Sequence, residues 1–285
     1  MKLAHRLPLA AIITAGALAG ITPATAEPAN SYVALGDSYA AGVGISNILD
    51  TACSRSDRNY AHLFAAQRGY QLTDVTCGGA TTKSVSETQL SAVTADTTLV
   101  TLGVGGNDIG FTDIVRDCVM AGTLGSGSSG TGSASGSFSG SVEALLGCKN
   151  KYGDVIPGRI AETSAKVTKL VADIRSRAPR ARVVLVGYPK ILPSDTSTCA
   201  GRQPVLPADA DWARDSVVAA LNTMLRTQAG TEYFSTYELY EGHDVCAAVP
   251  DRWVNGTKVE NGEGAQFHPN QYGHAATAGR MAVTL

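Results

Sequence analysis

A single serine stands where an apolar segment of the chain ends. In YVALGDSYAAGVG, residues 32–44, the apolar run stops at Gly36, and Asp37 and Ser38 follow. Gly-Asp-Ser suits an ordinary turn, but the tip of a buried strand is also where a serine hydrolase presents its nucleophile. A serine hydroxyl becomes an effective nucleophile only when a base takes its proton, so the same chain must also supply that base.

The elements that would position this serine alternate between strands and helices. Apolar runs predict five strands, which lie within residues 31–36, 71–79, 97–108, 181–189 and 231–236. Helical spacing predicts four helices, which lie within residues 59–69, 157–177, 211–229 and 270–285. Such alternation favours right-handed crossovers and an α/β fold, here a three-layer α/β/α sandwich with a mostly parallel five-stranded sheet.

Three glycine-rich corners follow the first three predicted strands. They are Gly36 to Ser38, Gly78 to Gly79, and Gly105 to Asn107. Sites in parallel sheets form at the carboxyl ends of the strands, so we expect these three corners to meet at one edge of the sheet. The sequence therefore predicts a site at this edge.

The corners do not match other common catalytic or cofactor motifs. The first strand is not followed by Gly-x-Gly-x-x-Gly, and the chain contains neither a phosphate-binding Gly-Lys-Ser/Thr loop nor a His-Glu-x-x-His zinc motif. Ala40 replaces the second glycine of the Gly-x-Ser-x-Gly nucleophile elbow, so Ser38 does not lie in an α/β-hydrolase elbow. Trypsin-like proteases carry Gly-Asp-Ser-Gly-Gly after their histidine, whereas here Gly-Asp-Ser comes first and Tyr39 follows.

Four blocks of the chain, in order, resemble the GDSL or SGNH hydrolases, and in particular secreted actinobacterial lipases and esterases. The blocks are GDSYAAG, CGGATT, GGND and FHPNQYGH. The resemblance implies a flavodoxin-like SGNH-hydrolase fold with Ser38 as the nucleophile and His268 as the base. It also implies an oxyanion hole formed by the Ser38 and Gly79 backbone N–H groups and the Asn107 side-chain amide.

The chain departs from the family at the third member of the triad. The family usually has an aspartate three residues before the histidine, where this chain has Ala265. The acceptor for a histidine Nδ1–H need not be charged, and some relatives use a main-chain carbonyl. We therefore expect a Ser38–His268 dyad oriented by the carbonyl of Ala265 or Gln266, and the carboxylate of Glu263 is the alternative.

The chain contains six cysteines, which allow fifteen pairings. The resemblance implies the disulfides Cys53–Cys77, Cys118–Cys148 and Cys199–Cys246. No Cys-x-x-Cys pair is present, and we expect neither a metal ion nor a cofactor.

Residues 1–26 have the features of a secretory signal peptide. Lys2 and Arg6 precede an apolar stretch, and ATA at residues 24–26 forms a small-residue cleavage pattern. The alternative is an N-terminal membrane anchor, but the apolar stretch is shorter than the ~20 residues that a spanning helix needs. Cleavage after Ala26 would leave one hydrolase domain, residues 27–285, secreted to the extracellular space and without a transmembrane segment.

Two further features of the mature chain are its charge and a Gly/Ser-rich segment. Removing Lys2 and Arg6 from the 23 basic residues leaves 21 against 25 acidic ones, so no basic surface for nucleic acid is expected. The Gly/Ser-rich residues 122–141 show no periodicity and predict a flexible loop bracketed by Cys118 and Cys148.

These observations predict a secreted, monomeric serine esterase or lipase. Its substrates would be small-molecule or lipid carboxylic esters, namely acylglycerols, phospholipids or short-chain esters. Two alternatives remain at this point: an acetylxylan-type polysaccharide esterase, and a non-catalytic secreted binding protein. Ile45, Ile109 and Phe111 are candidates for the walls of the acyl site, although core packing explains them equally well.

Overall fold

The computed structural model describes residues 30–126 and 147–285, so the expected signal peptide and most of the Gly/Ser-rich segment lie outside the described residues. Five strands form one sheet in the order β4–β1–β5–β6–β7, and every neighbouring pair is parallel. The strands are β1 Ser31–Gly36, β4 Gln71–Asp74, β5 Leu99–Gly103, β6 Arg182–Val186 and β7 Glu232–Phe234.

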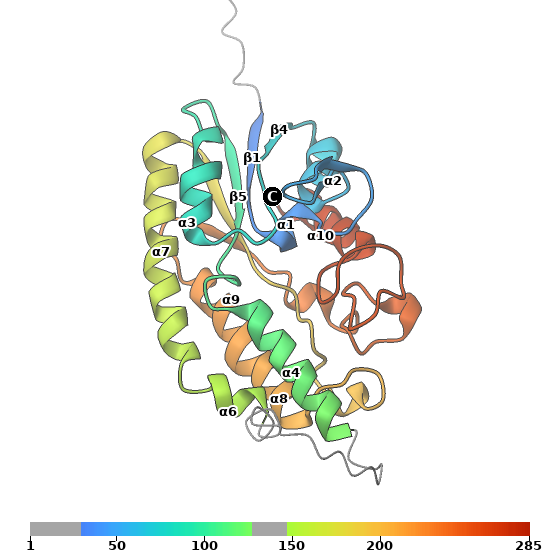
Figure 1. Ribbon diagram of the computed structural model, residues 1–285. Helices are drawn as coiled ribbons and strands as arrows, with labels where there is room; N and C mark the ends of the chain where they lie inside the picture. The colour runs from blue at the N-terminus through green and yellow to red at the C-terminus, as the bar shows by residue number, and fades with distance from the viewer. Residues whose placement is uncertain (1–29, 127–146) are drawn as a thin grey trace, which may run out of the picture.

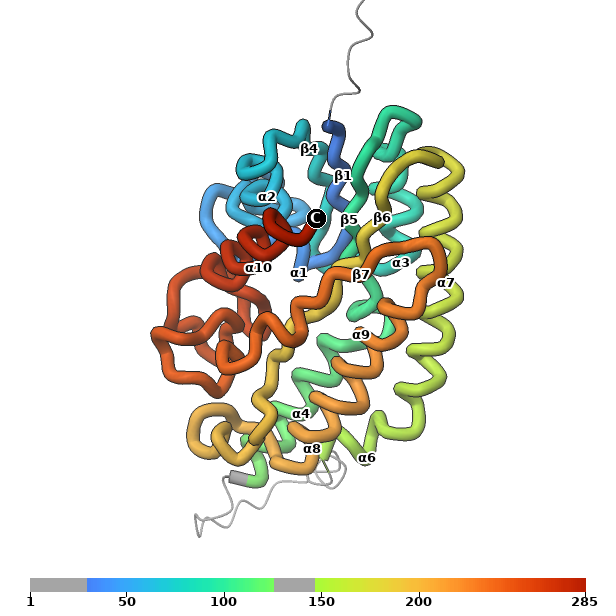
Figure 2. Tube along the Cα trace, turned by 180° about the vertical axis from the view of Figure 1, so that it is seen from behind, coloured from blue at the N-terminus to red at the C-terminus, as the bar shows by residue number. Residues whose placement is uncertain are grey.

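Helices cover both faces of this sheet (Figure 1). One face carries α2 and α10, which lie side by side, and the other carries α3, α7 and α9 (Figures 1 and 2). Their bounds are α2 Tyr60–Arg68, α3 Thr82–Ser84, α7 Ile156–Arg177, α9 Ala219–Arg226 and α10 Gln271–Thr284. The predicted three-layer α/β/α sandwich is confirmed.

The strands read as continuous apolar runs because both of their faces are buried. In β1, Val33 and Leu35 belong to the core beneath α7, whereas Tyr32 and Ala34 belong to the core beneath α2 and α10. The Tyr32 hydroxyl is hydrogen-bonded to the hydroxyl of Thr101 at 2.8 Å, which satisfies its polar group in the interior.

Three helices lie beyond the carboxyl ends of the strands (Figure 1). They are α4 Phe111–Ser126, α6 Cys148–Tyr152 and α8 Pro207–Trp212. The prediction of a loop from residue 122 is wrong for its first five residues, which continue α4. Packing outweighs composition here, because Gly122 lies so close to Pro204 that a Cβ would stand 2.2 Å from the proline carbonyl oxygen.

The remaining elements are short. A two-stranded ribbon comprises β2 Ile48–Asp50 and β3 Arg55–Ser56. Irregular helical turns comprise Val85–Gln89, Leu90–Ala92, Thr196–Cys199, Ala213–Val218, Glu238–Tyr240 and Val249–Asp251. Within the two described ranges, no helix combines the length and the hydrophobicity that a membrane crossing requires.

Three disulfides connect elements that are distant in sequence, and they are the pairs that the resemblance implied. Cys53–Cys77 joins the ribbon to the turn after β4, Cys118–Cys148 joins α4 to α6, and Cys199–Cys246 joins two loops.

Candidate active site

Ser38 is the first residue of the short helix α1, Ser38–Ala41, directly after β1. Asp37 caps this helix, since its carboxylate accepts a hydrogen bond from the backbone N–H of Tyr39 at 2.9 Å. Gly36 is required before it, because its φ is +151° and a Cβ would lie 2.6 Å from a carbonyl oxygen of β5. The chain thus turns from strand to helix at one point, which leaves Ser38 partly exposed above a buried Asp37.

His268 lies against Ser38, although 230 positions separate them in the sequence. Its Nε2 is 2.8 Å from Ser38 Oγ, and its Nδ1 is 2.7 Å from the carbonyl oxygen of Gln266. A carbonyl oxygen only accepts hydrogen bonds, so Nδ1 carries the proton and Nε2 is free to accept from the serine hydroxyl. Burial lowers the pKa of His268 below its ordinary value of 6.5, against the smaller opposing effect of the Gln266 carbonyl. The ring is therefore a neutral base at neutral pH.

Only one of the three proposed orienting groups faces this ring. The carbonyl of Ala265 does not bond the ring: it accepts from the backbone N–H of His268 at 3.3 Å and from the side-chain amide of Asn255 at 3.4 Å. The carboxylate of Glu263 accepts hydrogen bonds from the Ser46 N–H at 2.7 Å and from Arg58 at 3.2 Å. The orienting acceptor is the carbonyl of Gln266.

Tyr39 connects α1 to the turn that bears His268, a role that no sequence pattern indicated. Its hydroxyl donates to the carbonyl of Phe267 at 2.5 Å, and its ring centroid is 4.6 Å from that of the His268 imidazole. Phe267 has a φ of +58°, a conformation that bulky side chains rarely adopt, and its N–H donates to Asn255 O at 2.9 Å. Strain of this kind persists only where surrounding contacts impose it, and these contacts fix the imidazole relative to Ser38.

The second corner, Gly78 to Gly79, lies beside Ser38. The N–H of Cys77 donates to Gly36 O at 3.0 Å, which brings the turn after β4 against the end of β1. Gly79 is exposed in this turn with a φ of +76°, and a Cβ there would meet no atom within 4 Å. Its backbone conformation, not crowding within the protein, therefore favours glycine. No described residue accepts a hydrogen bond from the N–H of Gly79 or of Ser38.

The third corner, Gly105 to Asn107, places the side-chain amide of Asn107 near Ser38. Asn107 Nδ2 donates to the carbonyl of Ala80 at 2.9 Å, which occupies one of its two N–H groups. The neighbouring Asp108 accepts from the N–H of Thr82 at 2.9 Å and from its hydroxyl at 2.5 Å. These bonds tie the second and third corners together and hold the Asn107 amide beside the pocket that contains Ser38.

Tyr188, which sequence reasoning missed, connects the first corner with the third. Its hydroxyl accepts from the Gly106 N–H at 2.8 Å and donates to the carboxylate of Asp37. Burial raises the pKa of Asp37 from 3.8 to about 7, although hydrogen bonds from Tyr188 and the Tyr39 N–H oppose the shift. Because the folded-state pKa exceeds the unfolded one, the stability that Asp37 contributes in its protonated form is lost as the pH rises from about 4 to about 7.

Residues of the first and third corners and of the turn that bears His268 line one pocket of about 420 Å³ at the carboxyl edge of the sheet, whereas Gly79 is not among its wall residues. Its walls include Ser38, Asn107, Phe111, Phe267 and His268. Of the wall candidates named from the sequence, Phe111 lines the pocket, whereas Ile45 and Ile109 are fully buried in the interior. The pocket thus combines a serine, a neutral histidine and an amide donor.

The other described histidines, His62, His243 and His274, contact residues of the fold and do not line the pocket. The Nδ1 of His274 accepts from the Tyr60 N–H at 3.0 Å, and burial lowers the pKa of His274 to about 3. The Nε2 of His62 lies 3.4 Å from the carboxylate of Asp74, and His243 stacks on an indole ring. Within residues 30–126 and 147–285, no three His, Cys, Asp or Glu side chains are grouped so that they could hold a metal ion.

Comparisons with known proteins identify relatives of this chain. A family model described as the GDSL-like lipase/acylhydrolase family matches residues 34–276. Lipase 2 of Streptomyces coelicolor is 35% identical over 92% of this chain and 88% of its own length. The extracellular lipase of Streptomyces rimosus superposes with a TM-score of 0.66 at 27% identity, covering 89% of this chain and all of that one. Phospholipase A1 of Streptomyces albidoflavus superposes with a TM-score of 0.65 at 28% identity, covering 87% and 96%.

Proposed function

The chain belongs to the GDSL-like lipase/acylhydrolase family and is a carboxylic ester hydrolase, and we propose that it cleaves esters with a dyad of Ser38 and His268. The observation that carries this proposal is the 2.8 Å hydrogen bond between His268 Nε2 and Ser38 Oγ. It supports a nucleophile and its base because the other ring nitrogen already donates to the Gln266 carbonyl.

In the first step, Ser38 Oγ attacks the ester carbonyl carbon while its proton passes to His268 Nε2. The imidazolium that forms is oriented by the Gln266 carbonyl, a neutral acceptor in place of the usual aspartate. The lowered pKa of His268 keeps the ring unprotonated before the attack. The same lowered pKa makes the imidazolium a stronger acid, which favours return of the proton in the next step.

The carbonyl oxygen gains negative charge during the attack and needs donors that are already in place. We assign this role to the backbone N–H groups of Ser38 and Gly79 and to the side-chain amide of Asn107. Both backbone N–H groups lack an acceptor among the described residues, and the amide retains one free N–H there. Donors that are fixed before the reaction stabilise the oxyanion without further reorganisation.

Collapse of the tetrahedral intermediate breaks the bond to the alcohol oxygen, which takes the proton from His268. The acyl group remains on Ser38 Oγ as an ester. A water molecule then attacks this acyl carbon, transferring its proton to His268 Nε2. The second collapse releases the carboxylic acid and returns the proton to Ser38, so the dyad is regenerated.

Two further aspects of the function follow from the relatives and the sequence. Similarity to a lipase and to a phospholipase A1 supports acylglycerols or phospholipids as substrates. The three disulfides and the signal-peptide pattern of residues 1–26 support secretion. Mass spectrometry of protein from the culture medium of an actinobacterial host should find a mature chain that begins at Glu27.

Substitution of the dyad tests the proposal. Ser38→Ala and His268→Ala should each lower kcat for p-nitrophenyl butyrate by about 10⁴-fold or more, because the nucleophile and its base act as one unit. Ser86→Ala and His62→Ala, at residues outside the pocket, are the matched controls and should retain the wild-type rate. Near-normal hydrolysis by a folded Ser38→Ala protein would overturn the proposal.

A further inference from the structure

Asn255 is a buried residue that is bonded to the turn bearing His268, residues 263–268, which we call the histidine turn. Asn255 is only 1% exposed. Its backbone N–H donates to the carbonyl of His268 at 3.1 Å, and its backbone carbonyl accepts from the N–H of Phe267 at 2.9 Å. The loop that contains Asn255 therefore lies directly against the histidine turn.

The side-chain amide of Asn255 adds two hydrogen bonds to the histidine turn. Its Nδ2 donates to the carbonyl of Glu263 at 3.3 Å and to that of Ala265 at 3.4 Å. Gly264 lies between these two residues with a φ of +117°, and a Cβ there would stand 3.0 Å from the same nitrogen. An amide nitrogen suits this position because it carries two N–H groups, whereas an alanine, a leucine or an ionised aspartate would offer no donor.

These contacts fix the peptide units on both sides of Gln266, whose carbonyl orients the imidazole. The unit after Gln266 contains its carbonyl and the N–H of Phe267, and the two point in opposite directions because the peptide is planar and trans. The carbonyl of Asn255 binds that N–H, so the Gln266 carbonyl points the other way, where His268 Nδ1 lies at 2.7 Å. The unit before Gln266 contains the carbonyl of Ala265, which the Asn255 amide binds. Asn255 therefore holds the orienting carbonyl from both sides.

The histidine turn and Asn255 retain two features that lower the stability of the fold. Phe267 has a left-handed backbone, and Asn255 Oδ1 is buried without a hydrogen-bond partner among the described residues. The two bonds made by Nδ2 exceed the usual range of about 2.7–3.2 Å, so they add little stability in return. Unfavourable local features of this kind are typical of segments that serve a site.

We propose that Asn255 is a positioning residue for the reaction: its side-chain amide holds the histidine turn so that the Gln266 carbonyl faces His268 Nδ1. This inference rests on the proposed dyad and adds the residue that sets the geometry of its base. Asn255 does not line the pocket that contains Ser38, so it acts through the backbone of the turn. A free imidazole ring can carry its proton on either nitrogen, and the fixed carbonyl selects Nδ1.

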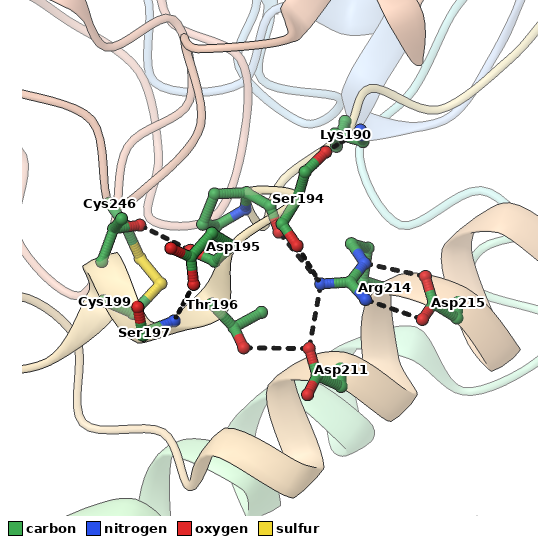
Figure 3. A network of polar contacts seen from close by, with 12 residues as sticks. Lys190, Ser194, Asp195, Thr196, Ser197, Cys199, Asp211, Arg214, Asp215 and Cys246 are labelled. Atoms are coloured by element: carbon green, nitrogen blue, oxygen red, sulfur yellow. Dashed lines mark hydrogen bonds and ion pairs between the residues drawn. A yellow bond between two sulfur atoms is a disulfide. The ribbon is translucent and has the colours of Figure 1, made fainter.

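A side chain that holds another loop in a similar way supplies the matched control. Arg214 donates to the carbonyl oxygens of Pro193 and Ser194 at 3.1 and 3.0 Å, and it also bonds Asp211 and Asp215 (Figure 3). None of these residues lines the pocket of the proposed dyad. Arg214→Met removes the bonds and should lower the unfolding temperature, while kcat for p-nitrophenyl butyrate stays within about twofold of wild type.

The test compares kcat, KM and thermal unfolding of Asn255→Ala and Asn255→Leu with the same ester. Leucine keeps nearly the volume of asparagine, so a fall in kcat that both variants share does not come from a cavity. Both should lower kcat about tenfold to a hundredfold with little change in KM, because a displacement of about 1 Å at the reacting groups can cost about 10² in rate. Their unfolding temperatures should stay close to that of wild type, because the two long bonds and the unpaired Oδ1 are lost together.

The tautomer of His268 separates positioning from a general loosening of the fold. Nitrogen NMR shifts of isotopically labelled protein, at a pH where the ring is neutral, report which ring nitrogen carries the proton, and the His268 signals are those that His268→Ala lacks. Wild type and Arg214→Met should carry it on Nδ1, whereas both Asn255 variants should show a mixture of Nδ1–H and Nε2–H. Wild-type kcat or an unchanged tautomer in the folded Asn255 variants would overturn the inference. Failure of the dyad is seen separately, as hydrolysis that survives Ser38→Ala.

Discussion

Replacement of Glu263 by alanine tests whether a carbonyl, and not an acid, orients His268, the base of the proposed dyad. Glu263 is the nearest acidic residue before His268 in the sequence. Its carboxylate binds the Ser46 N–H at 2.7 Å and Arg58 at 3.2 Å, whereas His268 Nδ1 lies 2.7 Å from Gln266 O. Loss of the aspartate from a Ser-His-Asp triad lowers kcat by about 10⁴-fold. Because Glu263 has no such contact, Glu263→Ala should retain kcat within about twofold of wild type.

The assay follows p-nitrophenolate release at saturating p-nitrophenyl butyrate, with thermal unfolding measured in parallel. The Arg58–Glu263 pair is 39% exposed on both sides, so solvent screens it and its loss should affect the fold only weakly. Glu263→Gln is the control, since it keeps an acceptor for the Ser46 N–H but removes the charge. If both variants lost turnover by about 10³-fold or more, with unfolding temperatures close to wild type, the carbonyl-oriented dyad would be refuted.

Three other predictions follow from the site. Asn107→Ala should lower kcat for the butyrate ester by about 10²–10³-fold with little change in KM, as expected for loss of one oxyanion donor; an equal rise in KM with unchanged kcat would contradict this role. The acid limb of kcat/KM should fall at a pH below 6.5, because burial lowers the pKa of His268 and only the neutral ring accepts the serine proton; a limb above 6.5 would contradict it. Asp37→Asn removes the carboxyl group whose pKa is raised to about 7. Urea unfolding of this variant should therefore show a smaller loss of stability between pH 4 and pH 7 than urea unfolding of the wild type. An unchanged dependence of the free energy of unfolding on pH would contradict the raised pKa of Asp37.

The sequence predicted the elements whose signals are local. The buried strand at residues 31–36 has the same bounds in the structure, because a strand covered on both faces must be apolar throughout. The helix expected within residues 59–69 is α2, capped by Asn59 at its start and by Gly69, with a φ of +69°, at its end. The motif residues Ser38, Asn107 and His268 line one pocket because strand ends and turns carry them to the same edge.

The features that the sequence did not predict depend on contacts between distant segments. Tyr39 and Tyr188 look like ordinary core aromatics, and only the folded chain directs their hydroxyls to Phe267 and Asp37. The single helix expected over residues 211–229 is divided by a π-helical turn between α8 and α9. The choice between neighbouring carbonyls beside His268 is set by the backbone of one turn, which residue types do not specify.

Covalent labelling with a reactive organophosphonate probes the activation of Ser38 by His268 itself, because only an activated serine displaces the leaving group of the reagent. The intact protein is treated at neutral pH, digested and mapped by mass spectrometry, and the labelling rate is compared between wild type and His268→Ala. We expect one adduct, on the peptide that contains Ser38, formed roughly a thousandfold or more slowly in His268→Ala. An adduct on another serine, or equal labelling of Ser38 in both proteins, would contradict the Ser38–His268 dyad.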